Sequence, residues 1–299
     1  MSERVSRRAF IEMAAIGAAA VGVGGAGKDS LPELDEIVRL HAKATGGICI
    51  LPGQWRPHYP YEQIAWIRPT WGGDQYVWLD FPEAIFTDIG LIFLSHINPQ
   101  IRSMYPELPR VEWQVEAEGI SYERTLPNSL WFGGRVSKET DTKVALRLSL
   151  RNGMDKPLRG ITLQTCAFLH GIKEFADETQ ENKFVFVRDA GWVTFEKARR
   201  EFKPKGRYKL GWRGGPAVAD WPVMAVRSNV AERHLAMTWY EDTLSLVGNK
   251  WHPCLHADPF FPDLEPGAQA DIRGALFFVE GSLEDVAGYL RADSPSVFS

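Results

Sequence analysis

The sequence predicts an all-β protein, a large antiparallel β-sandwich with short helices near its two ends. First, segments between Ile64 and Val279 alternate apolar and polar residues with a period of two, the pattern of half-buried strands. Second, short turns rich in glycine and asparagine separate these segments, and long helical patterns are few. No internal repeat or Pro/Ser-rich linker interrupts the series, so residues 31–299 are predicted to form one domain, with a division near residue 140 as the alternative.

Residues 1–30 have the features of an export signal. Arg7 and Arg8 follow Ser6 and precede Phe10, and an Ala/Gly-rich stretch continues to about Gly27. This arrangement resembles a twin-arginine (Tat) signal, the alternative being an ordinary N-terminal helix. The stretch is too short and too rich in small residues for a good membrane span. We therefore expect a periplasmic or secreted protein without a membrane span in its mature form, and one that folds before export.

Residues 31–47 follow the signal and have apolar positions at helical spacing before a Gly-Gly stop, so they predict a short helix. The clearest strand pair lies within residues 134–169. In its first strand Val144, Leu146, Leu148 and Leu150 alternate with more polar residues, which predicts one buried and one wetter face.

The remaining strands are expected in chain order within residues 63–81, 90–97, 111–127, 184–195, 223–229, 234–242, 243–249 and 270–281. Between them, residues 196–222 are basic, Gly-rich and irregular, which is typical of a long surface loop. Residues 282–292 predict a closing helix, because Ser282 is a good N-cap and acidic residues occupy the first turn.

Composition excludes several functional classes. Apolar residues make up 44% of the 299-residue chain, enough for a full core, and the net charge of −4 argues against nucleic-acid binding. The sequence lacks a G-x-S-x-G elbow, a P-loop and a Rossmann glycine pattern, which argues against serine hydrolases and nucleotide-binding enzymes. The spacing of Cys49, Cys166 and Cys254 matches no zinc module, so we expect three reduced and mostly buried thiols.

Two stretches carry a resemblance to a known fold family. The run "VALRLSLRNGMDKPLRGITLQTCAFL" and the later "HADPFFPDLEPGAQADIRGALFFVEG" are similar to strand pairs of the galactose-mutarotase-like supersandwich. This fold recurs in mutarotases, polysaccharide lyases and glycoside hydrolases, and the pattern covers roughly residues 60–280. The resemblance implies a carbohydrate ligand, a histidine acid and a glutamate base, which would fall on His252 or His256 and on Glu265.

The segment from Trp251 to Gly267 is the main candidate for catalysis. His252, His256, Asp258 and Glu265 supply imidazole and carboxylate groups, the usual acids and bases of sugar chemistry. The same groups can bind a divalent metal at His252, His256 and Asp258, an alternative that we do not favour. The third alternative is a rigid connection, since prolines restrict its backbone and exclude a regular HxxxH helix.

A second set supplies candidate substrate-binding residues. Arginine, carboxylate and indole groups often bind sugars through paired hydrogen bonds and ring stacking. The set consists of Asp220, Trp221, Arg227 and Asn229, with Trp251 as a further apolar wall. The alternative is a surface ion pair beside a core tryptophan. His96 and His170, at strand ends, are expected to be core histidines.

These observations predict an exported carbohydrate-active protein, acting on a glycan or sugar as a hydrolase, lyase or epimerase by acid–base catalysis. The alternative is a carbohydrate-binding or scaffolding protein of the cell envelope without catalytic activity. An enzyme needs the histidines and carboxylates to converge in one place, whereas a binding module needs only an aromatic surface.

Overall fold

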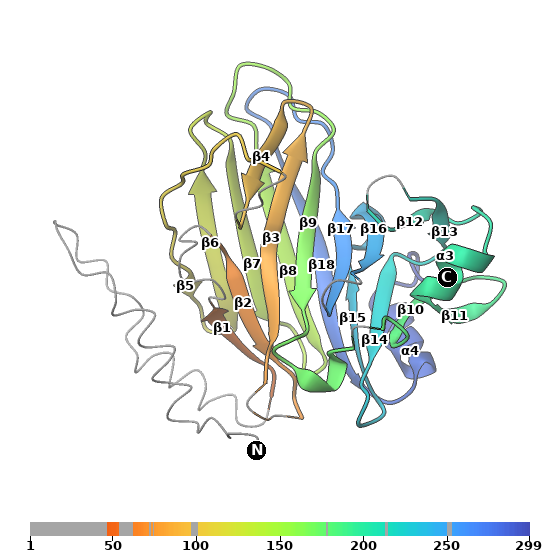
Figure 1. Cartoon of the computed structure of the whole chain (residues 1–299). Helices are drawn as coiled ribbons and strands as arrows, with labels where there is room; N and C mark the ends of the chain where they lie inside the picture. Colours follow the sequence, from red (N-terminus) through yellow and green to blue (C-terminus); the bar gives the residue numbers. More distant parts are fainter. Residues whose placement is uncertain are drawn as a thin grey trace.

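The computed structural model describes residues 47–53, 62–71, 73, 75–96, 101–177, 179–212, 215–249 and 253–299. The predicted export signal and the predicted helix up to residue 46 lie outside these ranges. The described residues form two nine-stranded sheets that pack face to face (Figure 1). The prediction of a large, antiparallel sandwich is therefore confirmed.

The first sheet has the strand order β1-β2-β3-β9-β17-β16-β12-β13, and β4 pairs with β3. Among the described strands, only β12 and β16 pair in parallel. The strands are β1 (Cys49–Gly53), β2 (Ile64–Arg68), β3 (Val77–Thr87), β4 (Gly90–Leu94), β9 (Thr162–Phe168), β12 (Tyr208–Leu210), β13 (Ala217–Ala219), β16 (Thr243–Gly248) and β17 (Cys254–Pro259).

The second sheet has the strand order β11-β10-β14-β15-β18-β8-β7-β6-β5. Its strands are β5 (Gln114–Val115), β6 (Gly119–Thr125), β7 (Trp131–Lys138), β8 (Lys143–Arg151), β10 (Lys183–Val187), β11 (Gly191–Thr194), β14 (Val223–Arg227), β15 (Arg233–Thr238) and β18 (Gln269–Glu280). The helical elements are η1 (Lys173–Phe175), α3 (Phe195–Glu201), η2 (Tyr240–Asp242) and α4 (Leu283–Asp293).

The main core lies between the two sheets and follows from the alternation in the sequence. Val144, Leu146, Leu148 and Leu150 of β8 are fully buried in it, while Arg147 and Arg151, which alternate with them, face solvent, as predicted. The closing helix is also confirmed. Ser282 caps α4 by accepting a hydrogen bond from the Asp285 N–H, and the Asp285 side chain bonds back to the Ser282 backbone.

The expected long surface loop at residues 196–222 was wrong. It contains α3 and the strands β12 and β13, which extend one edge of the first sheet. Thr194 caps α3 by accepting a hydrogen bond from the Lys197 N–H, and Phe195 and Ala198 anchor it in the core. The two strands have only three residues each, which is too short for a period of two to show in the sequence.

The outer face of the first sheet, which is turned away from the second sheet, carries the reactive side chains of β17. Successive side chains of a strand point to opposite faces. In β17, Leu255 and Ala257 enter the main core, so Cys254, His256 and Asp258 lie on the outer face. Both faces of β17 are buried, so three chemically reactive side chains lie in a protected environment.

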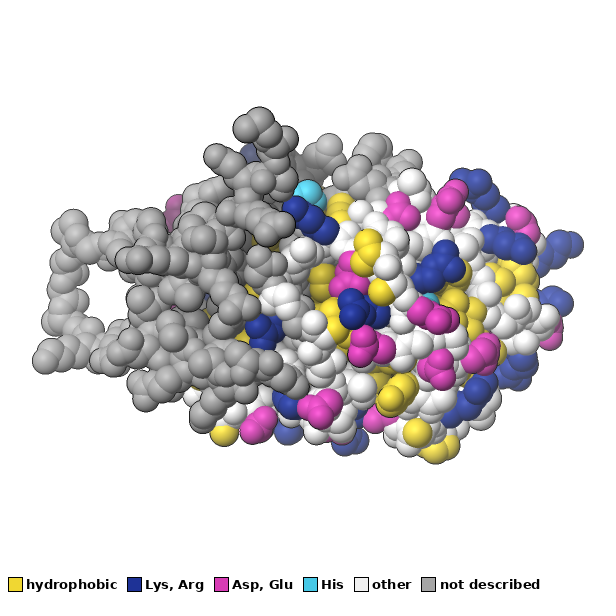
Figure 2. All heavy atoms as spheres, turned by 90° about the horizontal axis from the view of Figure 1, so that it is seen from below, with side chains coloured by type: hydrophobic (Ala, Val, Ile, Leu, Met, Phe, Trp, Pro, Cys, Tyr) yellow, Lys and Arg dark blue, Asp and Glu magenta, His cyan; other side chains and the backbone are white. Residues whose placement is uncertain are grey.

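Charged side chains of both signs are mixed on one face of the molecule. On the face shown in Figure 2, acidic and basic side chains are interspersed over the described part of the molecule. Within the described ranges, no helix has both the length and the apolar character needed to cross a membrane.

Candidate functional site

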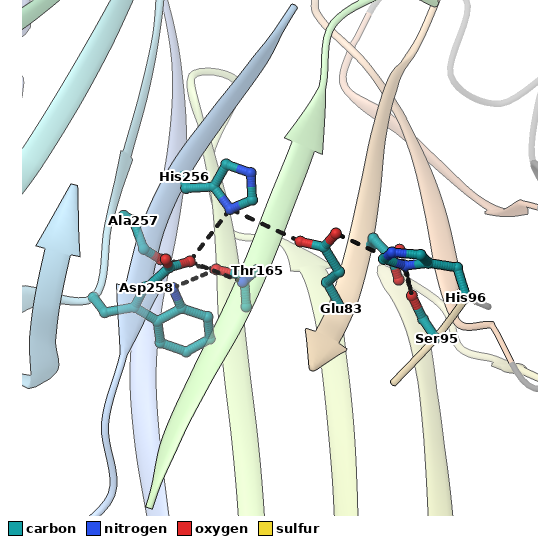
Figure 3. Close-up of polar contacts among 9 residues, drawn as sticks. Glu83, Ser95, His96, Thr165, His256, Ala257 and Asp258 are labelled. Atoms are coloured by element: carbon teal, nitrogen blue, oxygen red, sulfur yellow. Dashed lines mark hydrogen bonds and ion pairs between the residues drawn. The ribbon is translucent and has the colours of Figure 1, made fainter. Parts of the chain in front are cut away.

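A group of carboxylates and imidazoles lies on the outer face of the first sheet (Figure 3). Glu83 is at its centre. One carboxylate oxygen is 3.8 Å from Nδ1 of His96, and the other is 4.0 Å from Nδ1 of His256. Both distances are ion-pair contacts longer than a hydrogen bond, and a carboxylate between two imidazoles supplies the components of acid–base chemistry.

An irregularity in β3 places Glu83 on this face. The pairing of β3 with β9 shifts between Asp80 and Ala84, so strict alternation is lost there. Phe81 and Ile85 still enter the main core, but Glu83 points to the outer side, toward His96 and His256 (Figure 3). Bulges of this kind re-aim side chains and are frequent near active sites.

His96 comes from the chain just after β4, the strand that pairs with the end of β3. Its Nδ1 atom is 3.4 Å from Ser95 Oγ, and Ser95 Oγ donates a 2.6 Å hydrogen bond to Asp80. The backbone N–H of Ser95 also donates to the Glu83 carbonyl oxygen, at 2.8 Å. The two strand segments that carry Glu83 and His96 are therefore held together by hydrogen bonds.

His256 and Asp258 form the buried half of the group. Both lie on the same face of β17, and Nδ1 of His256 is 3.3 Å from Oδ1 of Asp258. Asp258 also accepts a 3.2 Å hydrogen bond from the Thr165 N–H of β9. The Thr165 hydroxyl donates to the Ala257 carbonyl oxygen and accepts from the indole N–H of Trp239. These bonds fix the carboxylate and so fix the orientation of the imidazole.

Burial and charge act against each other on this pair. Burial lowers the pKa of His256, but Cys254 and Asp258 outweigh burial and raise the pKa above its ordinary value. Burial raises the pKa of Asp258, and His256 and the Thr165 N–H oppose that rise. Each member of the pair therefore favours the charged form of the other, while burial favours the neutral form of both.

The solvent exposure of the side chains differs across the group. The side chains of Glu83 and His96 are 18% and 21% exposed, whereas His256 is 1% exposed. The ring of Trp212 covers His256 edge-on, with 5.0 Å between the ring centroids, and Trp212 is itself 45% exposed. A ligand from solvent therefore reaches Glu83 and His96 first.

Aromatic side chains continue on the same face of the sheet. Trp78 of β3 packs against Phe168 of β9 with ring centroids 5.9 Å apart, and His170 stacks on Phe168 at 5.8 Å. Trp78 is partly exposed and His170 is exposed, so His170 is not the core histidine that the sequence suggested. Partly exposed indole rings beside polar groups are the usual walls of sugar-binding sites.

Of the four predicted catalytic residues, the structure brings together His256 and Asp258. His252, and the predicted wall residue Trp251, lie outside the described residues. Glu265 is in an exposed loop beyond β17, where its carboxylate pairs with Arg159 at 3.1 Å. Leu264, the residue before Glu265, forms an isolated bridge with Leu158, and both leucines are buried in the main core.

The other predicted substrate-binding residues lie on β14 of the second sheet or next to its two ends, and they do not join the group. Trp221 is buried and stacks on Phe186 with 3.8 Å between the ring centroids. Arg227 is at the exposed end of β14, over the ring of Phe184. Asp220 accepts the Arg188 N–H, and the Asn229 N–H donates to the Glu174 carbonyl oxygen. Their separation follows from the topology, because β14 and β17 belong to different sheets.

Sequence reasoning did not find Glu83 or Asp80, and it placed His96 in the core. The Ser95-His96 pair after an apolar strand was the available signal for His96. Cys166 and Cys254 were expected to be reduced, buried thiols, and this is confirmed, but their closeness to His256 was not expected.

The comparisons with known proteins find resemblance in structure only. No protein-family model matches the chain, and no curated protein matches it. Among solved structures, the chain is similar to a galactose mutarotase related enzyme from Lactobacillus acidophilus, with 8% identity and a TM-score of 0.41, covering 78% of this chain and 98% of that chain.

Two further structures show the same degree of likeness. An aldose epimerase homologue from C. elegans has 12% identity and a TM-score of 0.38, covering 79% of this chain and 97% of that chain. Galactose 1-epimerase from Lactobacillus acidophilus has 9% identity and a TM-score of 0.33, covering 78% of this chain and 99% of that chain. Similarity at this level assigns no activity, so the function has to be argued from the site.

Proposed function

We propose that the protein is a carbohydrate-active enzyme in which Glu83 and His96 are the general base and general acid. One observation carries the proposal: a carboxylate and an imidazole lie 3.8 Å apart, both partly exposed, on a sheet face that also carries partly exposed tryptophans. Acid–base chemistry on a sugar uses a proton donor and a proton acceptor at its hydroxyl and ring oxygens, and indole rings provide flat apolar surfaces on which a sugar ring can stack.

The composition of the site favours epimerase or lyase chemistry over glycoside hydrolysis. Most glycosidases use two carboxylates, one on each side of the scissile bond. Among the described residues of this group, Glu83 is the carboxylate that a ligand can reach, since Asp80 and Asp258 are both 3% exposed. One carboxylate and one imidazole suit a reaction in which a proton is removed at one sugar atom and delivered at another.

The experiment combines binding and turnover on a panel of free aldoses and acidic polysaccharides. Proton NMR measures the exchange of anomers and the epimerisation of each aldose, and ultraviolet absorbance detects the unsaturated products of a lyase. We expect wild-type turnover on at least one member of the panel, and its loss in His96→Asn with binding retained. His170→Asn is the matched control, because His170 is exposed on the same face but does not contact Glu83 in the described structure.

Binding without turnover in every form would favour the carbohydrate-binding module, and neither binding nor turnover would contradict the proposal as a whole.

Export is part of the same proposal and rests on Ser6, Arg7, Arg8 and Phe10. Replacement of both arginines by lysine is expected to keep the protein in the cytoplasm, because the paired guanidinium groups define the Tat signal. Cell fractionation measures the distribution, and unchanged export of the double variant would contradict the Tat assignment.

A further inference from the structure

Three soft or nitrogen ligands meet on the outer face of the first sheet, beside the acid–base group. The sulfur atoms of Cys166 and Cys254 and a ring nitrogen of His256 all lie within 4.8 Å of one another. The three residues are 3%, 0% and 1% exposed. In a tetrahedral zinc site with Zn–S of about 2.3 Å and Zn–N of about 2.0 Å, neighbouring ligand atoms are about 3.5–3.8 Å apart. The observed upper limit of 4.8 Å is about 1 Å wider than this, a difference that side-chain rotations can close, so one ion can be reached by all three.

The strand register explains why these residues meet. Cys166 of β9 is directly opposite His256 of β17, and Cys254 is opposite Phe168, two positions along. All three side chains therefore point to the same face, with Cys254 diagonal to Cys166.

The same register disfavours a disulfide between the two cysteines. The Cα atoms of diagonal residues on antiparallel strands are about 7–8 Å apart. Disulfides require about 4.4–6.8 Å between Cα atoms, so closing the bond would distort two central strands. A metal ion replaces the single S–S bond by two metal–sulfur bonds. The two sulfur atoms can then stay farther apart, so the ion spans the diagonal without such distortion.

The residues around His256 hold its ring in the way that the neighbours of a metal-binding histidine do. Nδ1 of His256 is hydrogen bonded to Asp258, which leaves Nε2 as the nitrogen for a metal. The Thr165 N–H and the indole of Trp239, acting through the Thr165 hydroxyl, hold the carboxylate and its strand in place. A carboxylate behind a histidine ligand fixes its tautomer and its direction, an arrangement that is common at zinc sites.

We propose that Cys166, Cys254 and His256 bind a zinc ion. Two thiolates and a neutral imidazole carry the charge that balances Zn²⁺, and the ion takes the place of the protons that these groups hold without it. Among the described residues the group has three members, which leaves a fourth position for water or another ligand. The proposal differs from the metal alternative in the sequence, since Asp258 supports His256 and does not bind the ion. It does not depend on the sugar chemistry proposed for Glu83 and His96.

The first test measures metal content in the full-length protein. After anaerobic reconstitution with ZnCl₂ and removal of excess metal, plasma mass spectrometry is expected to find about one zinc ion per chain. Cys166→Ser and Cys254→Ser are expected to lose it. Cys49→Ser is the matched control and is expected to keep it, because Cys49 is also a buried free thiol but packs with Leu51 and Tyr76 in another cluster. Asp258→Asn is expected to weaken zinc affinity about 10–100-fold.

The second test uses Co²⁺ in place of zinc and does not need the variants to fold. The wild-type protein is expected to show sulfur-to-cobalt charge-transfer absorption and the strong visible bands of a tetrahedral site. Absence of these bands, or of any uptake of zinc, would overturn the proposal. Full zinc content in a folded Cys254→Ser protein, or a Cys166–Cys254 disulfide in protein purified without reductant, would overturn it equally.

Discussion

Replacing Glu83 with glutamine is expected to lower the turnover number about 100–10,000-fold, the usual contribution of a general acid or base. Glutamine has nearly the same shape but cannot accept a proton, and it removes the negative charge that lies 3.8 Å from His96 and 4.0 Å from His256. The side chain is already partly exposed, so we expect little change in thermal stability. The measurement is the turnover number at saturating substrate, for whichever sugar the panel identifies.

Glu241→Gln is the control for this prediction, because Glu241 is an exposed glutamate in η2. Its activity should match that of the wild type. Full activity of Glu83→Gln together with loss of turnover in Glu265→Gln would return the catalytic role to the loop that the sequence favoured.

Replacing Trp239 with alanine is expected to lower the free energy of unfolding by about 3–5 kcal/mol. The side chain is completely buried, and its ring stacks on Phe81 with 5.9 Å between centroids. It packs so closely on β18 that a Cβ atom at Gly274 would come within 2.8 Å of the indole. The cavity cannot close easily, because the strands around it are fixed by the hydrogen bonds of both sheets. Urea denaturation followed by circular dichroism measures the change.

Two further tryptophan variants make this prediction specific. Trp239→Phe keeps an aromatic ring against Phe81 but loses the hydrogen bond to the Thr165 hydroxyl. The missing hydrogen bond is expected to lower the free energy of unfolding by about 1 kcal/mol. Trp212→Ala removes a tryptophan that is 45% exposed and should change stability by only about 0.5 kcal/mol. A loss for Trp239→Ala no larger than that for Trp212→Ala would contradict the prediction that the buried indole of Trp239 stabilises the core.

The fold was predictable because long strands show their alternation in the sequence. The residues from Val144 to Leu150 show it over a whole strand, and their burial follows the predicted pattern. The same rule fails where a strand is irregular. Continued from Trp78 and Asp80, strict alternation would turn Glu83 toward the main core, and the shift in β3 reverses this. The alternation of apolar and polar residues in the sequence does not reveal a bulge of this kind.

The site was only partly predictable because it depends on strand order. His256 and Asp258 are two residues apart on one strand, so their shared face can be read from the sequence. Cys166 comes to His256 only because β9 lies next to β17 in the sheet. Which strands lie side by side is decided by the topology of the whole sandwich. The alternation of apolar and polar residues does not specify that topology. The basic segment between α3 and β13 was predicted as a loop for a related reason. Its short strands form only by pairing with the edge of the first sheet.

The hairpin of β12 and β13 at the edge of the first sheet allows such a protein to diversify in sequence near the site. Trp212, which stands over His256, is carried on the segment between β12 and β13, whereas Glu83 and His256 are carried on β3 and β17 in the interior of the sheet. Insertions, deletions or exchanges in this peripheral hairpin can therefore alter what surrounds the imidazole without disturbing the strands that hold it. Selection for a new substrate could act on the hairpin alone, so related chains would differ most at the segment that borders the site and least at the groups that perform its chemistry.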